Sequence, residues 1–223
     1  MKSTMKISGE ARRAAIIKTA RDVFIEKGFY RTTTRELAEA AGVSEALLFR
    51  HFPSKEALYS AIQTSCFKEA RSKITERLDS LEPSTAALVS LVRDLITHVL
   101  GAEPDEDDRL FVRLALRSLI DEGEFARLAI QGGLSDWVKK VEQCIQAAQA
   151  AGDMVETPVR ANLGGWFVHH LISGILIHSL PASSIIDYGV PREEILTQLG
   201  RFCLRGVGLK EKALRRCCKE QGS

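Results

Sequence analysis

The sequence lacks the short motifs that mark many enzymes, and its cysteines form no framework. None of the motifs G-x-S-x-G, H-E-x-x-H, the P-loop or G-x-G-x-x-G occurs in its 223 residues. The cysteines are odd in number and contain no C-x-x-C pair, which argues against a disulfide scaffold and a zinc site: Cys66, Cys144, Cys203, Cys217 and Cys218. We therefore expect a cytoplasmic, non-catalytic protein with reduced thiols, no cofactor and no metal.

Strand patterns and membrane-length apolar runs are also scarce. The N-terminal stretch MKSTMKISGEARRAA is charged and has no apolar centre, unlike a signal peptide. The longest apolar run, residues 163–180, contains His, Gly and Ser, which favours a buried helix over a membrane span. Period-2 alternation is nearly absent, and Asn-Gly and Asp-Gly hairpin turns are missing. The sequence therefore predicts an all-α protein.

Charge is distributed unevenly along the chain. Residues 1–60 contain 11 Lys and Arg against 7 Asp and Glu, whereas the remainder contains 20 against 22. A basic N-terminal segment on a nearly neutral body indicates a polyanionic partner for that end of the chain.

Apolar periodicity, capping residues, Gly and Pro predict about nine helices. Their ranges are 10–27, 35–41, 45–52, 55–78, 84–100, 109–121, 133–151, 158–180 and 191–208. Thr34 is the expected N-cap of the second helix. We expect a helix-turn-helix domain at 1–58, a helical ligand-binding and dimerisation domain at 59–209, and a disordered basic tail at 210–223.

The second and third predicted helices are short and are joined by a tight turn at Gly42, the pattern of a helix-turn-helix. The inward positions are expected to be Leu37, Ala38, Ala41, Val43, Leu48 and Phe52. On a helical wheel the outward positions are Ala46, Leu47, Phe49 and Arg50. An exposed face with two large apolar residues beside an Arg suits a DNA groove, because Arg binds guanine and apolar groups contact thymine methyls.

The stretch ARRAAIIKTARDVFIEKGFYRTTTRELAEAAGVSEALLFRHFPSKEAL, residues 11–58, resembles the N-terminal domain of the TetR family of transcriptional regulators. The resemblance implies a homodimer on a palindromic operator, released by a small-molecule effector. It places Thr34, Ser44, His51 and Lys55 at phosphate contacts. It places Glu45, Ala46, Leu47, Phe49 and Arg50 at the groove. The family usually has Tyr at Phe49, Gly at Ala46 and a small polar residue at Leu47, so a more apolar contact is expected here.

The resemblance also assigns the helices near 158–180 and 191–208 to a dimer interface. The residues expected there are Gly165, Leu171, Gly174, Ile175, His178, Ile195, Leu199 and Phe202. The histidines at 170 and 178 lie on one face, and we favour interfacial or core roles for them over metal binding. An effector pocket is expected among His98, Phe111, Arg117, Trp137, Phe167 and His170.

Other patterns leave alternatives open. Arg109, Arg113 and Arg117 form an i, i+4 stripe that fits either an anionic ligand or a solvated ion-pair face, of which we favour the latter. The Cys217-Cys218 pair fits a redox sensor or, as we favour, an accidental pair. The leading hypothesis is a ligand-responsive repressor, and the alternatives are a partner-binding or thiol-sensing protein and an enzyme.

Overall fold

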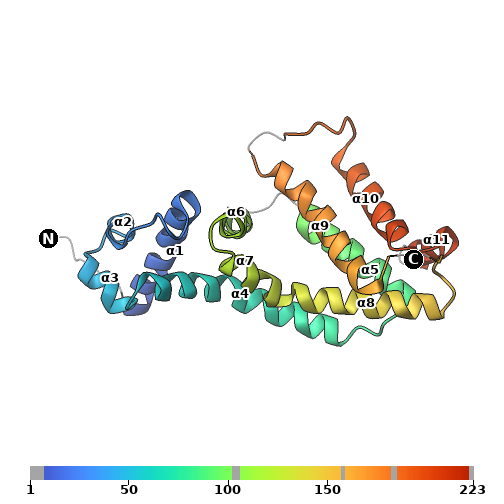
Figure 1. Cartoon of the computed structure of the whole chain (residues 1–223), viewed down its shortest axis with the longest axis horizontal. Coiled ribbons are helices and arrows are strands. Elements are labelled where there is room, and N and C mark those ends of the chain that lie inside the picture. Colours follow the sequence, from blue (N-terminus) through green and yellow to red (C-terminus); the bar gives the residue numbers. More distant parts are fainter. Residues whose placement is uncertain (1–7, 102–105, 157–158, 182–184, 221–223) are drawn as a thin grey trace. The chain divides into compact units, whose positions relative to one another are not determined.

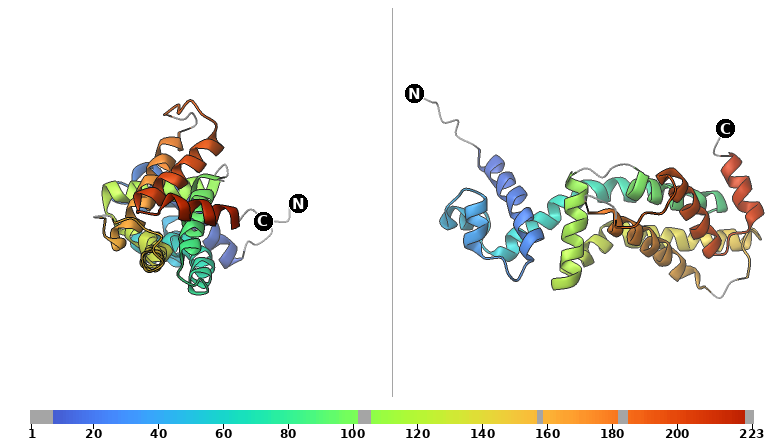
Figure 2. Two further views of the ribbon diagram at one scale, coloured as in Figure 1. Left: turned by 90° about the vertical axis from the view of Figure 1, so that its right-hand side faces the viewer. Right: turned by 90° about the horizontal axis from the view of Figure 1, so that it is seen from above.

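The structure is a computed structural model that describes residues 8–101, 106–156, 159–181 and 185–220. The side chains of 66–75, 106–108, 110, 111, 132, 219 and 220 are outside this description. All regular elements in the described ranges are helices, drawn as coiled ribbons in Figures 1 and 2. Outside the helices, Met154 and Leu209 form an isolated antiparallel β-bridge. The predicted all-α class is therefore confirmed. None of the described helices has the length and apolarity that crossing a membrane requires.

The chain divides into two compact units, and the first comprises residues 1–73 and 106–132. Its helices are α1 (Gly9–Lys27), α2 (Thr34–Ala40), α3 (Glu45–His51), the first part of α4 (Lys55–Asp79), α6 (Glu106–Asp121) and α7 (Glu124–Ala129). Ile16, Ala20 and Phe24 bury one face of α1, as their spacing predicts. Leu58 and Ile62 of α4 and Leu114 of α6 belong to the same core.

This grouping differs from the predicted domain boundary after residue 58. The boundary falls inside α4, because its first turns supply buried side chains to the core of α1, α2 and α3. Helices α6 and α7 join the same unit from far along the chain, since α6 packs against α1 and α7. The first unit thus contains more of the chain than the helix-turn-helix segment alone.

The second unit comprises residues 74–105 and 133–223. Its described helices are α5 (Thr85–Ile96), α8 (Ser135–Ala150), α9 (Ala161–Ser179), α10 (Arg192–Gly206) and α11 (Glu211–Glu220). Short π-helical turns, η1 (Thr97–Gly101) and η2 (Ile130–Leu134), follow α5 and α7. Helix α8 packs against both α5 and α9. Val92, Val141 and Ile172, one from each of these three helices, are fully buried in the unit's core.

The sequence missed two helices among the described residues. Helix α7 has only six residues, which are too few to show a clear apolar period, and its N-cap is Gly123, with a φ of +73°. Helix α11 lies where a disordered tail was expected, and that prediction was wrong. Ala213, Leu214 and Cys217 are buried in the core of the second unit. Helix α11 therefore packs on this core through one apolar face, although most of its other residues are charged.

Candidate nucleic-acid interface

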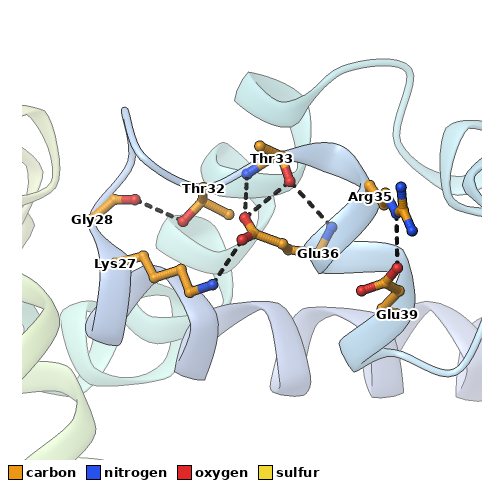
Figure 3. A network of polar contacts seen from close by, with 7 residues as sticks. All are labelled: Lys27, Gly28, Thr32, Thr33, Arg35, Glu36 and Glu39. Carbon is orange, nitrogen blue, oxygen red and sulfur yellow. Dashed lines mark hydrogen bonds and ion pairs between the residues drawn. The ribbon is translucent and has the colours of Figure 1, made fainter.

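Helix α2 begins with a network of polar contacts that fixes its position against α1 (Figure 3). The Thr33 hydroxyl accepts from the backbone N–H of Glu36, and the Glu36 carboxylate accepts from the Thr33 N–H at 2.9 Å, a capping box. Lys27 Nζ of α1 donates to Glu36 Oε1 at 2.7 Å. The hydrogen bond from Lys27, with those from Thr33, lowers the pKa of Glu36 to about 2. The N-cap is therefore Thr33 and not the predicted Thr34, because only residue 33 stands three positions before the glutamate.

The turn between α2 and α3 has the geometry of a helix-turn-helix. Gly42 has a φ of +61°, a left-handed conformation that glycine adopts without steric cost. The Val43 N–H donates to the Ala38 carbonyl at 3.0 Å and closes α2. The Ser44 hydroxyl then caps α3 by accepting from the Leu47 N–H at 3.2 Å. These bonds fix the direction in which α3 leaves the turn.

Helix α3 has one buried face and one exposed face. Leu48 is buried, and so is Phe52, the residue that ends the helix. Glu45, Ala46, Phe49 and Arg50 are exposed, with 42% of Phe49 open to solvent. Leu47 is half-buried and so contributes less to the outer surface than its wheel position suggests. The exposed face thus presents an aromatic ring, a guanidinium and one residue small enough for close backbone approach.

The four residues expected at phosphate contacts have different surroundings. Thr34 donates its hydroxyl proton to Glu45 Oε2 at 3.1 Å, which ties the starts of α2 and α3 together. Lys55 Nζ donates to the carbonyls of Phe29 and Thr32 at 2.9 and 3.0 Å and lies 4.4 Å from the centre of the Phe29 ring. Lys55 therefore anchors α4 to the α1–α2 loop and has at most one N–H left for a phosphate. Ser44 is exposed, and His51 is half-buried beside Phe52.

The residues predicted for a dimer interface fall into two groups. Leu171, Gly174, Ile175, His178, Ile195 and Phe202 are exposed or partly exposed. Gly165 is instead buried, and a Cβ there would lie 3.3 Å from Val138 Cα, so its small size serves packing of α9 on α8. Leu199 is buried in the core of its own unit. The assignment of Gly165 and Leu199 to an intersubunit surface was therefore wrong.

The six predicted pocket residues do not gather into one site among the described residues. His98, Phe167 and His170 are exposed, Trp137 is buried in the core of the second unit, and the side chain of Phe111 is outside the described residues. Arg117 belongs to the first unit, where Nε donates to Asp121 Oδ2 at 2.9 Å. Arg117 of the stripe is thus held in an ion pair, and this pair is half-buried, unlike the solvated ion-pair face that the sequence favoured.

The second unit contains a groove that the sequence did not indicate. It has a volume of about 400 Å³ and is lined by Pro83, Ser84, Thr85, Ala86, Ala147, Ala151, Asp153, Arg216 and Cys217. Asp153 Oδ2 accepts from the Thr85 hydroxyl at 2.7 Å and from Arg216 at 2.6 Å, which lowers the pKa of Asp153. The groove lies beside α11, a helix that was expected to be disordered, and this is why its residues were missed.

Two comparisons show which known proteins have a similar segment. The family model described as "Bacterial regulatory proteins, tetR family" matches residues 16–62, which include α2, α3 and the turn between them. The HTH-type transcriptional repressor Rv1474c of Mycobacterium tuberculosis is 36% identical over 118 residues, covering 52% of this chain and 56% of that protein. RutR, an HTH-type transcriptional regulator of Escherichia coli strain K12, is 48% identical over 52 residues, covering 23% of this chain and 24% of RutR. Residues 16–62 thus match the helix-turn-helix segment of the TetR family.

Solved structures extend the likeness of fold to most of the chain. NalD of Pseudomonas aeruginosa, the secondary repressor of the MexAB-OprM multidrug efflux pump, matches with a TM-score of 0.64 at 22% identity, over 92% of this chain and all of NalD (100%). AibR, solved with isovaleryl coenzyme A and operator DNA, matches with a TM-score of 0.60 at 20% identity, over 85% and 96% of the two chains. By contrast, the chain spans only about half or less of the length of the two curated relatives above in sequence.

Proposed function

We propose that this chain is a homodimeric transcriptional repressor of the TetR family that binds a palindromic operator and is released by a small molecule bound in its second unit. The observation that carries the proposal is the exposed face of α3, with Phe49 and Arg50 outward and Leu48 anchoring the helix. Helix-turn-helix proteins place such a helix in the major groove.

The residues of α3 suit base recognition at short range. The Arg50 guanidinium matches the O6 and N7 acceptors of guanine, and Phe49 can contact the methyl group of thymine. Ala46 brings the backbone close to the base edges. Glu45 is held by Thr34 and accepts hydrogen bonds, which suits the amino group of cytosine. Because Phe49 has no hydroxyl, Arg50 supplies most of the polar discrimination on this helix.

The names of the relatives support the repressor part of the proposal. Rv1474c and NalD are both named as repressors, and AibR was solved with operator DNA and an acyl coenzyme A. A protein of this kind couples DNA and effector binding reciprocally, so that each ligand weakens the other by the same factor.

The second unit supports dimer formation. Phe167 of α9 is 54% exposed and Phe202 of α10 is 68% exposed, and α9 and α10 are in contact. At roughly 200 Å² per aromatic side chain, these two rings expose on the order of 250 Å². Leu163, Leu171 and Ile177 add further apolar surface on α9. Exposed apolar patches of several hundred Å² mark interaction surfaces, and a second copy of the chain is the partner that the family implies.

Within the first unit, α6 offers a means of moving the DNA-binding helices. Arg117 of α6 donates to the carbonyl of Lys27 at the end of α1. Tyr59 of α4 donates to Glu122, directly after α6, at 2.8 Å. A displacement of α6 on effector binding would therefore act on α1 and α4, which hold α2 and α3 through the shared core.

Selection of random duplex DNA by the purified protein tests the proposal, with the variants Arg50→Ala and Arg127→Ala run in parallel. Arg127 is an exposed residue of α7 with the same charge and serves as the control. Wild type and Arg127→Ala are expected to recover the same palindrome, whereas Arg50→Ala recovers a relaxed version of it. Recovery of no common sequence by the wild-type protein at any salt concentration would overturn the proposal.

A further inference from the structure

Helix α9 has two opposite faces of different character. Gly164, Gly165, Val168 and Ile172 are buried inside the second unit. On a wheel of about 100° per residue, six residues of the other face lie within about 60° of Gly174. They are Leu163, Phe167, His170, Leu171, Ile177 and His178, and all six are exposed. Helix α9 contains no Asp, Glu, Lys or Arg, so this face, here called the outer α9 face, meets no charge repulsion from its own copy.

Gly174 lies at the centre of the outer α9 face and is open. No atom lies within 4 Å of the position that a Cβ would take there. Glycine at this point allows the backbone of a second helix to approach closely. His170 and His178 stand four residues before and four residues after this central glycine, and each is therefore about 6 Å from it along the helix axis.

The imidazole of His178 is already oriented. Its Nδ1 lies 2.6 Å from the carbonyl oxygen of Gly174. Because a carbonyl oxygen only accepts hydrogen bonds, Nδ1 carries the proton and Nε2 of the neutral ring keeps its lone pair. A backbone carbonyl that holds one ring nitrogen in this way is the usual support of a metal-binding histidine. His169, in contrast, is half-buried on another side of α9, with Nε2 3.2 Å from the Ser173 hydroxyl.

A two-fold axis placed beside Gly174 would bring the histidines of two copies together. In an antiparallel helix pair, where the helix dipoles oppose each other, the residue four positions after the crossing point faces the residue four positions before it. His178 of one protomer then faces the partner's His170, and the symmetry operation repeats the pair on the other side of the axis. Among the described residues of one chain, no three His, Cys, Asp or Glu side chains are grouped so that they could hold a metal ion.

We propose that the homodimer binds two divalent transition-metal ions, Zn²⁺ being the representative, each between His178 of one protomer and the partner's His170. The site rests on the proposed homodimer and revises the expectation of no metal. Neutral imidazole is a preferred ligand of Zn²⁺ but not of Mg²⁺, and water completes the coordination of a two-histidine site. The ions would cross-link the two copies at the outer α9 face and thereby stabilise the dimer.

The test uses the full-length protein without an affinity tag, because a histidine tag binds Zn²⁺ itself. Light scattering first gives the oligomeric state without metal, and calorimetric titration then gives the number of Zn²⁺ ions bound. We expect two ions per wild-type dimer, a higher melting temperature with Zn²⁺, and no such change with Mg²⁺. His170→Ala and His178→Ala are each expected to lose both ions, whereas His98→Ala, at an exposed histidine of η1, keeps them.

The outcomes separate the metal site from the dimer. A dimer that binds no Zn²⁺, or binds it equally well in both variants, would overturn the metal site and leave the dimer standing. Retention of one ion per dimer in each single variant would contradict the pairing of residue 178 with residue 170, because like residues would then face each other. A monomer at all concentrations would contradict the proposed homodimer itself. Circular dichroism of the variants, whose changed residues are exposed, confirms that each is folded.

Discussion

The guanidinium of Arg117 donates a hydrogen bond of 3.0 Å to the backbone carbonyl of Lys27, 90 residues earlier in the chain. The acceptor lies in the last turn of α1, where carbonyls lack partners within the helix. Arg117 also holds Asp121 at 2.9 Å, and both side chains are largely shielded from water. The C-terminal part of α6 thus supplies the cap that α1 cannot supply for itself.

Replacing Arg117 with Ala should reduce the free energy of unfolding by about 1.5–3 kcal/mol, the range for hydrogen bonds to charged groups. Both the Lys27 carbonyl and the Asp121 carboxylate lose a donor. Arg113→Ala, at an exposed position one turn earlier on α6, should change stability by less than about 0.5 kcal/mol. Urea unfolding of the two variants measures the difference. Equal effects would mean that the contact with Lys27 does not stabilise the first unit.

Gly28 makes room for the Arg117–Asp121 pair. Its φ of +78° and ψ of 167° lie in a region open essentially only to glycine, and a Cβ would overlap the Asp121 carboxylate. Gly28→Ala should therefore cost roughly 3 kcal/mol or more, from backbone strain and from displacement of the ion pair. Gly42→Ala, at a φ of +61° with open space around it, should cost only about 1–2 kcal/mol. Thermal unfolding of both variants gives the comparison, and a smaller loss for Gly28→Ala would be inconsistent with the overlap.

The Glu36 carboxylate gives the first unit a defined dependence on pH. Its pKa is about 2 in the folded protein, because of Lys27 and Thr33, against about 4.3 in an unfolded chain. A lowered folded-state pKa contributes stability that is complete above the unfolded value and is lost as the pH falls from about 4.3 towards 2. The stability difference between wild type and Glu36→Gln should therefore shrink across this range.

Nuclear magnetic resonance titration of the side-chain carboxyl carbons checks this pKa directly. The Glu36 signal should titrate well below the ordinary range of a glutamate carboxyl group. A Glu36 midpoint in the ordinary range would show that the capping network does not persist in solution.

Helix α11 should be part of the folded second unit. Leu214 is 6% exposed in its core, so Leu214→Ala is expected to cost about 2–4 kcal/mol. Lys212→Ala, on the exposed side of the same helix, should be nearly neutral. Hydrogen exchange offers a second measurement, because amides of α11 that exchange as fast as those of an unfolded peptide would restore the original prediction of a disordered tail.

The sequence predicted the helix-turn-helix segment well, because the residues that determine its structure are close together in the chain. Gly42 for the turn, Ser44 for the cap, and Leu48 and Phe52 for the inward face are all read within a dozen residues. The error at Thr34 was a shift of one position, where three consecutive threonines offer three possible caps and only the reach to Glu36 decides among them.

Predictions that depend on contacts distant in sequence were less successful. No local pattern shows that Arg117 binds the Lys27 carbonyl, or that Gly165 packs on Val138 instead of on a second copy. Leu199 and Phe202 share a helix and are both apolar, yet one is buried and the other exposed, which only the packing of α10 on its own core decides. For the same reason the groove beside α11 had no signal in the sequence.

Sequence reading by the exposed face of α3, as proposed above, is tested by the ratio of the protein's affinities for the selected palindrome and for a scrambled duplex. The ratio is measured at several salt concentrations for wild type, Arg50→Ala and Arg127→Ala. Arg50→Ala is expected to lose about 1–3 kcal/mol of discrimination per half-site, whereas Arg127→Ala keeps the wild-type ratio. An unchanged ratio in Arg50→Ala would show that Arg50 does not read the bases and contributes at most to contacts with the phosphate backbone.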